Sequence, residues 1–337
     1  MSRFIESLWY RFSPWHILLW PLSWLYAGLS TFRRTLYRAG VCKTGKLPVP
    51  VIVVGNITAG GSGKTPLVIW LVDFLRSKGY APGVVSRGYG RDGNALCEVS
   101  AQSDAASVGD EPLLIFRRAA CPVVVGADRV AAARMLLRNH PHLNVIISDD
   151  GLQHYRLARD VEICVVDGER GFGNGMRIPA GPLREKLTRL DAVDAIVVNG
   201  EKINFSIKTN IYKTTMQLVG DRFFNLKQPQ QQVPAADFKQ KKIHAIAGIG
   251  NPGRFFAHLH QLGLEFSAHA FPDHFRFRAA DLAFNGADAV LMTEKDAVKC
   301  RTFATDRHWA LAVSAQLDES FGAHMLKQLT QPKDPKK

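Results

Sequence analysis

The chain has 337 residues, of which 46% are hydrophobic and 22% charged. These proportions exclude collagen-like, low-complexity and wholly disordered chains, and the length favours two domains. The five scattered cysteines include no C-x-x-C pair, which argues against a disulfide framework or a structural zinc site. The formal net charge of +13 favours anionic partners: a phosphorylated ligand, a membrane surface or nucleic acid.

The chain begins with an apolar, aromatic-rich segment. Residues 12–32 contain no Asp, Glu, Lys or Arg. Tryptophans, which favour membrane interfaces, gather here at Trp9, Trp15, Trp20 and Trp24. As a helix, residues 12–32 would be about 31 Å long, the thickness of a bilayer core. We expect a membrane span or a deeply set anchor, although Pro14 and Pro21 weaken a continuous helix. The alternative is an apolar helix packed on the protein body.

Basic residues follow the apolar segment. They are Arg33, Arg34, Arg38, Lys43 and Lys46, with no acidic residue among them. By the positive-inside rule, this flank predicts that everything after residue 33 is cytoplasmic. The same charges favour contact with an anionic membrane surface. No clear A-x-A site follows, which disfavours a cleavable signal peptide.

From residue 47 onward, short apolar β-branched runs alternate with helical patterns. The predicted strands are 51–54, 83–85, 121–125, 144–148, 161–166 and 195–198, and the predicted helices are 67–78, 112–118 and 128–138. Such alternation is typical of a parallel sheet covered on both faces. Gln, Pro and Lys are frequent between residues 226 and 242, which indicates a linker. Further strands and a helix after residue 243 predict a second, smaller α/β domain.

A glycine-rich loop follows the first predicted strand. It reads Gly55-Asn56-Ile57-Thr58-Ala59-Gly60-Gly61-Ser62-Gly63-Lys64-Thr65 and opens a helix. Small residues let backbone N–H groups turn toward a phosphate, and the helix N-terminus adds its positive end. Residues 58–65 are therefore predicted to bind a nucleoside triphosphate as a variant P-loop in which Thr58 replaces the usual glycine. Lys64 would reach the β- and γ-phosphates, and the Thr65 hydroxyl would bind Mg²⁺.

Acidic residues that could hold the metal follow a later strand. Asp149 and Asp150 end the run 144–150, and the carboxyl ends of parallel strands face the ligand crevice. We predict them as Mg²⁺ ligands; the alternative is a solvated turn. Asp110 and Glu111 precede an apolar helix, a pattern that by itself indicates N-capping. Taken alone, His274 is more typical of a surface or core histidine than of a proton-transfer residue.

Two weaker motif matches do not support a function. Residues 248–253 fit G-x-G-x-x-G, but Pro252 removes a backbone donor from the turn that would hold a pyrophosphate. Residues 293–296 follow an apolar strand, but their order, Thr-Glu-Lys-Asp, differs from that of a guanine-reading loop. The second mismatch favours ATP over GTP.

Several short motifs occur in order along almost the whole chain. They lie at 54–66, 86–91 (Ser-Arg-Gly-Tyr-Gly-Arg), 109–112 (Gly-Asp-Glu-Pro), 149–154 (Asp-Asp-Gly-Leu-Gln-His), 172–175, 179–185, 248–255, 273–275 and 293–299. With the Trp-rich N-terminus, this set resembles the tetraacyldisaccharide 4'-kinase family, the lipid A 4'-kinases of Gram-negative bacteria. The loop of that family resembles this one, Thr58 included.

The resemblance implies a fold and an organisation. It implies a P-loop NTPase-like, mostly parallel α/β domain, a second smaller α/β domain, and an N-terminal membrane helix. The corresponding division is an anchor with its basic flank (1–46), a P-loop kinase domain (47–210), linker strands with a Gln/Pro/Lys-rich connection (211–242), a second α/β domain (243–330) and a basic tail (331–337). The active site would lie in the cleft between the two domains.

The resemblance also implies an activity. ATP would phosphorylate the 4'-hydroxyl of a tetraacylated glucosamine disaccharide 1-phosphate, giving lipid IVA at the cytoplasmic face of the inner membrane. Asp110 resembles the base that accepts the hydroxyl proton, and His274 its partner from the second domain. Asp150 and Thr65 would hold Mg²⁺. Lining the same site would be Asp149, Glu111, Gln153 and His154. Candidate contacts to phosphate or substrate are Arg87, Arg91 and Arg184, each of which could instead be structural or solvated.

Two other classes of function remain open at this point. A membrane-anchored P-loop ATPase could act as a switch or a partner-binding module. A nucleic-acid-binding ATPase would fit the charge, but no base-stacking motif supports it, and we expect no nucleic-acid partner.

Overall fold

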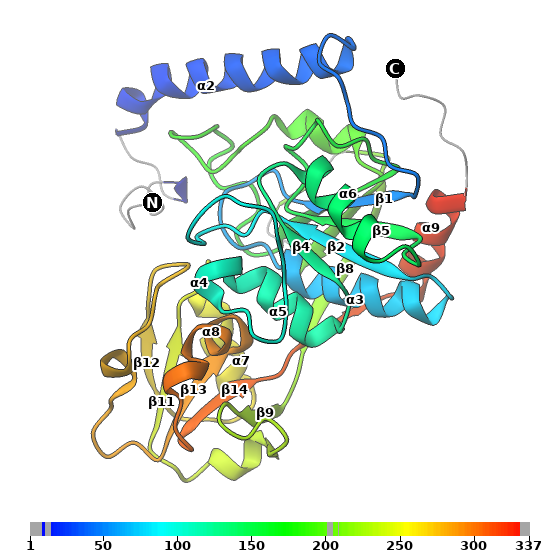
Figure 1. Cartoon of the computed structure of the whole chain (residues 1–337). Coiled ribbons are helices and arrows are strands. Elements are labelled where there is room, and N and C mark those ends of the chain that lie inside the picture. The colour runs from blue at the N-terminus through cyan, green and yellow to red at the C-terminus, as the bar shows by residue number, and fades with distance from the viewer. Residues whose placement is uncertain (1–8, 11–14, 201–204, 208, 331–337) are drawn as a thin grey trace.

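The structure is a computed structural model, and it describes residues 9–10, 15–200, 205–207 and 209–330 (Figure 1). In this part of the chain the strands form two sheets, one of nine strands and one of six. From edge to edge, the larger sheet contains β15 (Ser314–Leu317), β8 (Tyr212–Val219), β7 (Ala195–Asn199), β6 (Val161–Asp167), β1 (Val51–Gly55), β5 (Val145–Asp149), β2 (Pro82–Ser86), β4 (Val123–Val125) and β3 (Cys97–Glu98). Strands β8 to β4 run parallel, and the two edge strands are antiparallel to their neighbours.

Both faces of the larger sheet are buried, as its apolar strands predict. Along β1, Ile52 and Val54 enter one core, and Val51 and Val53 enter the other. The first core is covered by α3 (Lys64–Ser77), α5 (Asp110–Ala119) and α9 (Glu319–Thr330), and the second by α6 (Arg129–Asn139) and residues of the segments 152–157 and 183–193. The short helices α4 (Ala105–Val108) and η1 (Leu187–Ala192) complete this first unit. The sheet is therefore the central layer of a three-layer unit.

The six-stranded sheet forms a second, smaller unit. Its order is β10 (Gln232–Pro234), β9 (Arg222–Asn225), β14 (His308–Leu311), β13 (Ala289–Thr293), β11 (Ile243–Ala247) and β12 (Ser267–Ala270). Its helices are α7 (Pro252–Gln261), α8 (Glu294–Cys300) and the short η2 (Ala235–Phe238), η3 (Ala279–Leu282) and η4 (Arg301–Phe303). Helix α8 packs against α4 and α5 of the first unit (Figure 1).

The units divide the chain differently from the boundaries that the resemblance implies. Strand β8 lies in the expected linker 211–242 but belongs to the first sheet, whereas β9 and β10 belong to the second. Strand β15 and helix α9 lie within the expected second domain, 243–330, but they belong to the first unit. There β15 pairs antiparallel with β8, and Phe321 and Met325 are fully buried in the core beside α3. Local composition could not reveal this return, because it depends on pairing between distant strands.

The N-terminal helix α2 (Trp15–Arg38) lies along the first unit (Figure 1). Within the part of the chain that the structure describes, no helix has both the length and the apolar character needed to cross a bilayer. The expected N-terminal membrane helix is therefore not supported as a span, and residues 12–14 of that segment lie outside the described residues. The physical reason is that α2 carries Ser, Thr and His, and continues into Arg33 and Arg34.

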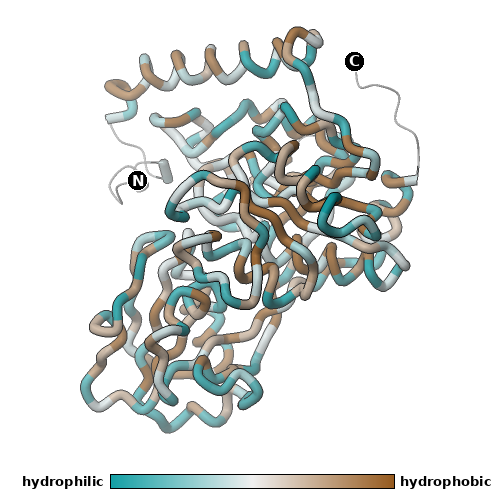
Figure 2. Tube along the Cα trace, viewed as in Figure 1, coloured by the Kyte–Doolittle hydropathy of each residue, from teal (hydrophilic) through white to brown (hydrophobic). Residues whose placement is uncertain are grey.

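Two surfaces of α2 differ sharply. The inner one is held by polar contacts: Ser23 Oγ donates to Arg177 O at 2.7 Å, and Arg177 Nη1 donates to Ala27 O at 2.7 Å. The outer one is apolar, and Trp24 is 77% exposed. Other large exposed side chains there are Ile17, Leu18, Leu22, Leu25, Leu29 and Phe32. Figure 2 shows hydrophobic positions recurring along the helix.

Candidate active site

The predicted phosphate loop joins β1 to α3. Gly60 and Gly63 adopt φ angles of 96° and 92°, a left-handed conformation that favours glycine. Asn199 Nδ2, at the end of β7, donates to Ser62 O at 3.0 Å. A Cβ at Gly63 would lie 2.1 Å from that same nitrogen, so this position also requires glycine for space.

Contacts within the first unit hold the rest of the loop. Asn56 Nδ2 donates to Gly60 O at 3.3 Å and to Ser62 Oγ at 3.2 Å. Ala59 N donates to Pro182 O at 2.7 Å, and Thr58 forms a bridge with Leu183. Thr58 thus takes part in backbone pairing, which explains how the loop accommodates a residue other than glycine. The loop is preformed by its own unit.

The two acids after β5 have different surroundings. Lys64 Nζ lies 3.5 Å from Asp150 Oδ1, and Arg184 Nη1 donates to both Asp150 oxygens at 3.2 Å. Burial raises the pKa of Asp150, but the positive charges of Lys64 and Arg184 lower it by a larger amount. The net pKa of Asp150 is therefore well below its ordinary value. Asp150 also has a φ of 46°, a strained conformation for a non-glycine residue.

Asp149 is completely buried. Its Oδ2 accepts a hydrogen bond from Ser86 Oγ at 3.1 Å, and its Oδ1 accepts none from the described residues. Burial and the neighbouring carboxylates of Glu111 and Asp150 raise the pKa of Asp149 to about 7. A buried acceptor without a donor, beside other carboxylates, is an arrangement that a cation would relieve.

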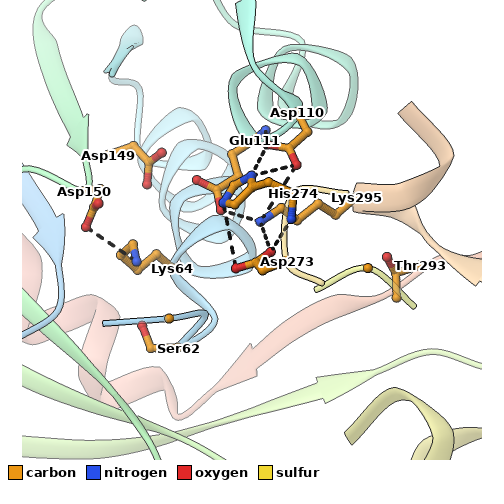
Figure 3. Close-up of polar contacts among 12 residues, drawn as sticks. Ser62, Lys64, Asp110, Glu111, Asp149, Asp150, Asp273, His274, Thr293 and Lys295 are labelled. Carbon is orange, nitrogen blue, oxygen red and sulfur yellow. Dashed lines mark hydrogen bonds and ion pairs between the residues drawn. The ribbon is translucent and has the colours of Figure 1, made fainter. Parts of the chain in front are cut away.

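Asp110 and His274 meet across the two units (Figure 3). Asp110 is the first residue of α5, and His274 follows β12; His274 Nδ1 lies 3.1 Å from Asp110 Oδ2. Burial raises the pKa of Asp110, but the hydrogen bond with His274 and the charge of Lys295 lower it to about 2. Burial lowers the pKa of His274, but the same hydrogen bond produces a net rise. The pair is a carboxylate held against an imidazole that favours its charged form.

Lys295 lies in the same cluster, and sequence reasoning gave it no role. Its Nζ lies 2.8 Å from Glu111 Oε1 and 3.2 Å from Asp273 Oδ1 (Figure 3). Burial lowers the pKa of Lys295, but Glu111, Asp110 and Asp273 raise it well above its ordinary value. One signal could have found this residue: it lies two positions after the end of β13 in the second sheet, close to the strand-end position that singled out Asp149 and Asp150 in the first.

Three of the remaining predicted residues, Gln153, Arg184 and His154, lie close to the phosphate loop or to the acids after β5. Gln153 Nε2 donates to Asn56 O at 3.0 Å and to Glu185 Oε1 at 2.8 Å, so it supports the start of the phosphate loop just after β1. Arg184 binds Asp150, as described above. His154 packs beside Arg129, and burial and that guanidinium lower the pKa of His154 to about 4.

Two predicted arginines, Arg87 and Arg91, follow β2. Arg87 is exposed, and Arg91 Nη2 donates to Ala95 O at 2.6 Å. Their loop also reaches the second unit, where the Tyr89 ring lies 4.9 Å from the His274 ring.

Arg129 was not among the predicted site residues. It is buried near Asp149 and Asp150, and burial lowers its pKa to about 10.

The G-x-G-x-x-G segment of the second unit also faces the phosphate loop. A Cβ at Gly250 would lie 2.4 Å from Gly61 N and 2.9 Å from Gly61 Cα. Glycine at position 250 therefore lets the two loops approach each other. Asp296 holds the segment in place, since Gly248 N donates to its Oδ2 at 3.0 Å. The Thr-Glu-Lys-Asp motif thus supports this loop through Asp296 and the acidic cluster through Lys295.

A cavity of about 870 Å³ lies between the units, beside the phosphate loop. Its walls include residues 61–66, Trp70 on α3, and Ala257 and His258 on α7. Lys295 and Glu111 also line it. One cavity therefore extends from the phosphate loop to Glu111 and Lys295, the neighbours of the Asp110–His274 pair, and has room for a nucleotide-sized ligand.

Comparisons with known proteins agree on one family. The family model described as tetraacyldisaccharide-1-P 4'-kinase matches residues 15–330. The tetraacyldisaccharide 4'-kinase of Methylobacillus flagellatus is 48% identical over 329 residues, which cover 98% of this chain and 96% of the relative. That of Nitrosococcus oceani is 49% identical, over 98% of this chain and 95% of the relative. The crystal structure of LpxK from Aquifex aeolicus in complex with ATP aligns with a TM-score of 0.80 at 31% identity, covering 93% of this chain and 99% of that one.

Proposed function

Since the chain belongs to the tetraacyldisaccharide 4'-kinase family, we propose that its cleft transfers the γ-phosphate of ATP to the 4'-hydroxyl of a tetraacylated disaccharide 1-phosphate. The protein is an ATP-dependent kinase of lipid A biosynthesis, and lipid IVA is the product. The observation that carries the assignment of roles is the Asp110–His274 pair, whose neighbours Glu111 and Lys295 line the same cavity as the phosphate loop.

Each group has a role in this reaction. The phosphate loop and Lys64 bind the triphosphate, and the cavity next to Trp70 takes the nucleoside. Asp110 accepts the proton of the 4'-hydroxyl as the phosphoryl group leaves ATP. His274, on the opposite unit, orients Asp110 and stabilises its negative charge. Phosphoryl transfer asks chiefly for such positioning and charge stabilisation.

Mg²⁺ fits this site. Among the described residues, no three His, Cys, Asp or Glu side chains converge as a complete ligand set. Mg²⁺ in kinases commonly uses one or two carboxylates together with phosphate oxygens and waters. Asp149, whose Oδ1 is buried without a hydrogen-bond donor, and the Thr65 hydroxyl would hold the ion, with Asp150 beside them. When bound, the ion neutralises charge on the phosphates. Glu111 contributes less, because it is paired with Lys295.

The outer face of α2 supports a location at the cytoplasmic face of the inner membrane. Its exposed Trp and Leu side chains form an apolar surface, and basic residues follow at the end of the helix. A helix of this kind lies in the plane of the membrane interface with its apolar face buried. A substrate with four acyl chains stays in the bilayer, so an enzyme bound to the same surface meets it there.

The test is transfer of phosphate to the lipid. Purified full-length protein is incubated with ATP, Mg²⁺ and tetraacyldisaccharide 1-phosphate in mixed micelles, and mass spectrometry follows the lipid. We expect a bisphosphorylated lipid from the wild type and almost none from Asp110→Asn or Lys64→Ala. Hydrolysis of ATP without a second phosphate on the lipid would contradict the proposal and favour an ATPase switch.

A further inference from the structure

Lys295 lies within a cluster of carboxylates contributed by both units. Its Nζ is 2.8 Å from Glu111, 3.2 Å from Asp273 and 4.0 Å from Asp110. Asp110 and Glu111 begin α5 of the first unit, whereas Asp273 and Lys295 belong to the second. The Lys295 side chain is 15% exposed, so most of the cluster is shielded from water.

The position of Lys295 in its own helix is electrostatically unfavourable. It is the second residue of α8, and a cation near a helix N-terminus is repelled by the positive end of the helix dipole. Glu294 and Asp296 in the same turn compensate for part of this repulsion, but they pair with Arg118 and Lys299. The carboxylates of Glu111 and Asp273 supply the remaining negative charge, and Glu111 lies across the boundary between the units.

We propose that Lys295 is a positioning residue for phosphoryl transfer, which holds the acids at the start of α5 and the Asp273–His274 segment in one fixed arrangement. The ammonium group binds Glu111, next to the proposed base, and Asp273, next to the base's histidine partner. It therefore fixes both residues of the Asp110–His274 pair through their neighbours in the chain. The inference rests on the proposed role of Asp110 as the base.

A second ion pair between the same two helices provides a matched control. Arg118, on α5, pairs with Glu294, the residue before Lys295 on α8. Arg118 also donates through Nη2 to Val313 O at 3.3 Å. The Arg118–Glu294 pair, like that of Lys295, is partly or fully buried and joins the two units. Arg118 lies eight positions after Asp110 on α5, about 12 Å along the helix axis.

The experiment compares Lys295→Met, Lys295→Arg and Arg118→Met in the full-length chain. For each variant we would measure kcat and the KM values for ATP and for the lipid, after checking by thermal melting that the variant is folded. We expect Lys295→Met to lower kcat about 100-fold with both KM values within about twofold of wild type. Lys295→Arg keeps the positive charge but places its hydrogen-bond donors differently. Its kcat should therefore be about tenfold higher than that of Lys295→Met and about tenfold lower than that of the wild type. Arg118 also lines the cavity, so only its kcat serves as the control, and Arg118→Met should lower kcat less than about threefold.

Three outcomes would overturn the proposal. Equal losses of kcat in Lys295→Met and Arg118→Met would mean that Lys295 only joins the units. A raised KM for ATP with an unchanged kcat would mean that Lys295 binds nucleotide instead. If Lys295→Met does not fold, Lys295→Gln, which also removes the charge but keeps a polar side chain, replaces it, and wild-type kcat in that variant would refute the role.

Asp110→Asn, measured in parallel, separates this proposal from the proposed function. Near wild-type kcat in Asp110→Asn would show that the proposed base is wrong, and the role of Lys295 would fall with it. An inactive Asp110→Asn together with wild-type kcat in Lys295→Met would leave the proposed function standing and reject only the role of Lys295.

Discussion

The two units differ in how they hold their share of the site. The phosphate loop is braced inside the first unit, by Asn56 and by Asn199 at the end of β7. In the second unit, His274 and Lys295 make close contacts with Asp110 and Glu111 of the first. The first unit alone therefore holds the phosphate loop in shape, whereas the Asp110–His274 pair forms only where the two units are in contact.

The largest expected effect comes from removing the proposed base. Asp110→Asn takes away the proton acceptor but leaves the phosphate loop intact. We expect kcat to fall by about 10²–10⁴-fold while the affinity for ATP stays within about threefold of wild type. Single-turnover kinetics and calorimetric titration with a non-hydrolysable ATP analogue measure the two quantities. Lost affinity for ATP alongside kcat would contradict the division of labour between the units.

A smaller loss should follow when the two loops are forced apart. At Gly250, an added methyl group would lie 2.4 Å from Gly61 N, whereas at Gly253 the nearest atom is Asn251 Oδ1 at 3.5 Å. Gly250→Ala should therefore lower kcat by about 10-fold or more, because it shifts His274 from Asp110. Gly253→Ala is the matched control and should change kcat less than about twofold. Similar kinetics for the two variants would show that this close approach is unimportant.

The dependence of Mg²⁺ affinity on pH tests the acid of the first unit. The pKa of Asp149 is raised to about 7, so in the metal-free protein about half of the Asp149 carboxyl groups carry a proton at neutral pH. Because the folded state holds this proton more tightly than the unfolded chain, stability without metal should fall as pH rises from about 4 to about 7. Mg²⁺ must displace the proton, so its affinity should rise up to about tenfold between pH 6 and pH 8.

Thermal shifts with Mg²⁺ and a non-hydrolysable ATP analogue would measure this dependence. The same titration of Asp149→Asn corrects for protonation of the nucleotide itself, since that variant has no carboxyl group to titrate at this position. An equal pH dependence in wild type and Asp149→Asn would show that Asp149 does not hold the ion.

The smallest effect is expected at the exposed edge of the contact between the units. Arg276 Nη2 donates to Asp92 Oδ1 at 2.6 Å, but both side chains are about two-thirds exposed (67% and 65%). Exposed ion pairs contribute little, so Arg276→Gln should change kcat and the melting temperature only slightly, kcat by less than about twofold. Steady-state kinetics and a thermal melt would check this. A tenfold loss of kcat in Arg276→Gln would contradict the prediction and show that this exposed ion pair is important for activity.

Local features of the fold and site could be predicted from the sequence. The phosphate loop depends on neighbouring residues, so its strand and helix are read directly from the chain. The order of the motifs identified the family, and the comparisons confirm it. The uncharged run at 12–32 predicted an anchor, but counting charges overlooked the polar contacts of Ser23 and His16 with the first unit.

What could not be predicted depends on distant residues. Lys295 is 184 positions from Glu111, and only the folded structure brings them together. Strand β15 likewise returns to β8 of the first sheet across the whole of the second unit. Neither juxtaposition leaves a periodic pattern or a spacing in the sequence, because each results from how the two units pack.

A double-mutant cycle on lipid phosphorylation tests the central claim most directly. The kcat values of Asp110→Asn, His274→Gln and the double variant are compared with that of the wild type. If the two side chains act as one pair across the units, the double variant should be almost no slower than Asp110→Asn alone. If the two losses multiply, Asp110 and His274 act independently, and the account of a shared site between the units is contradicted.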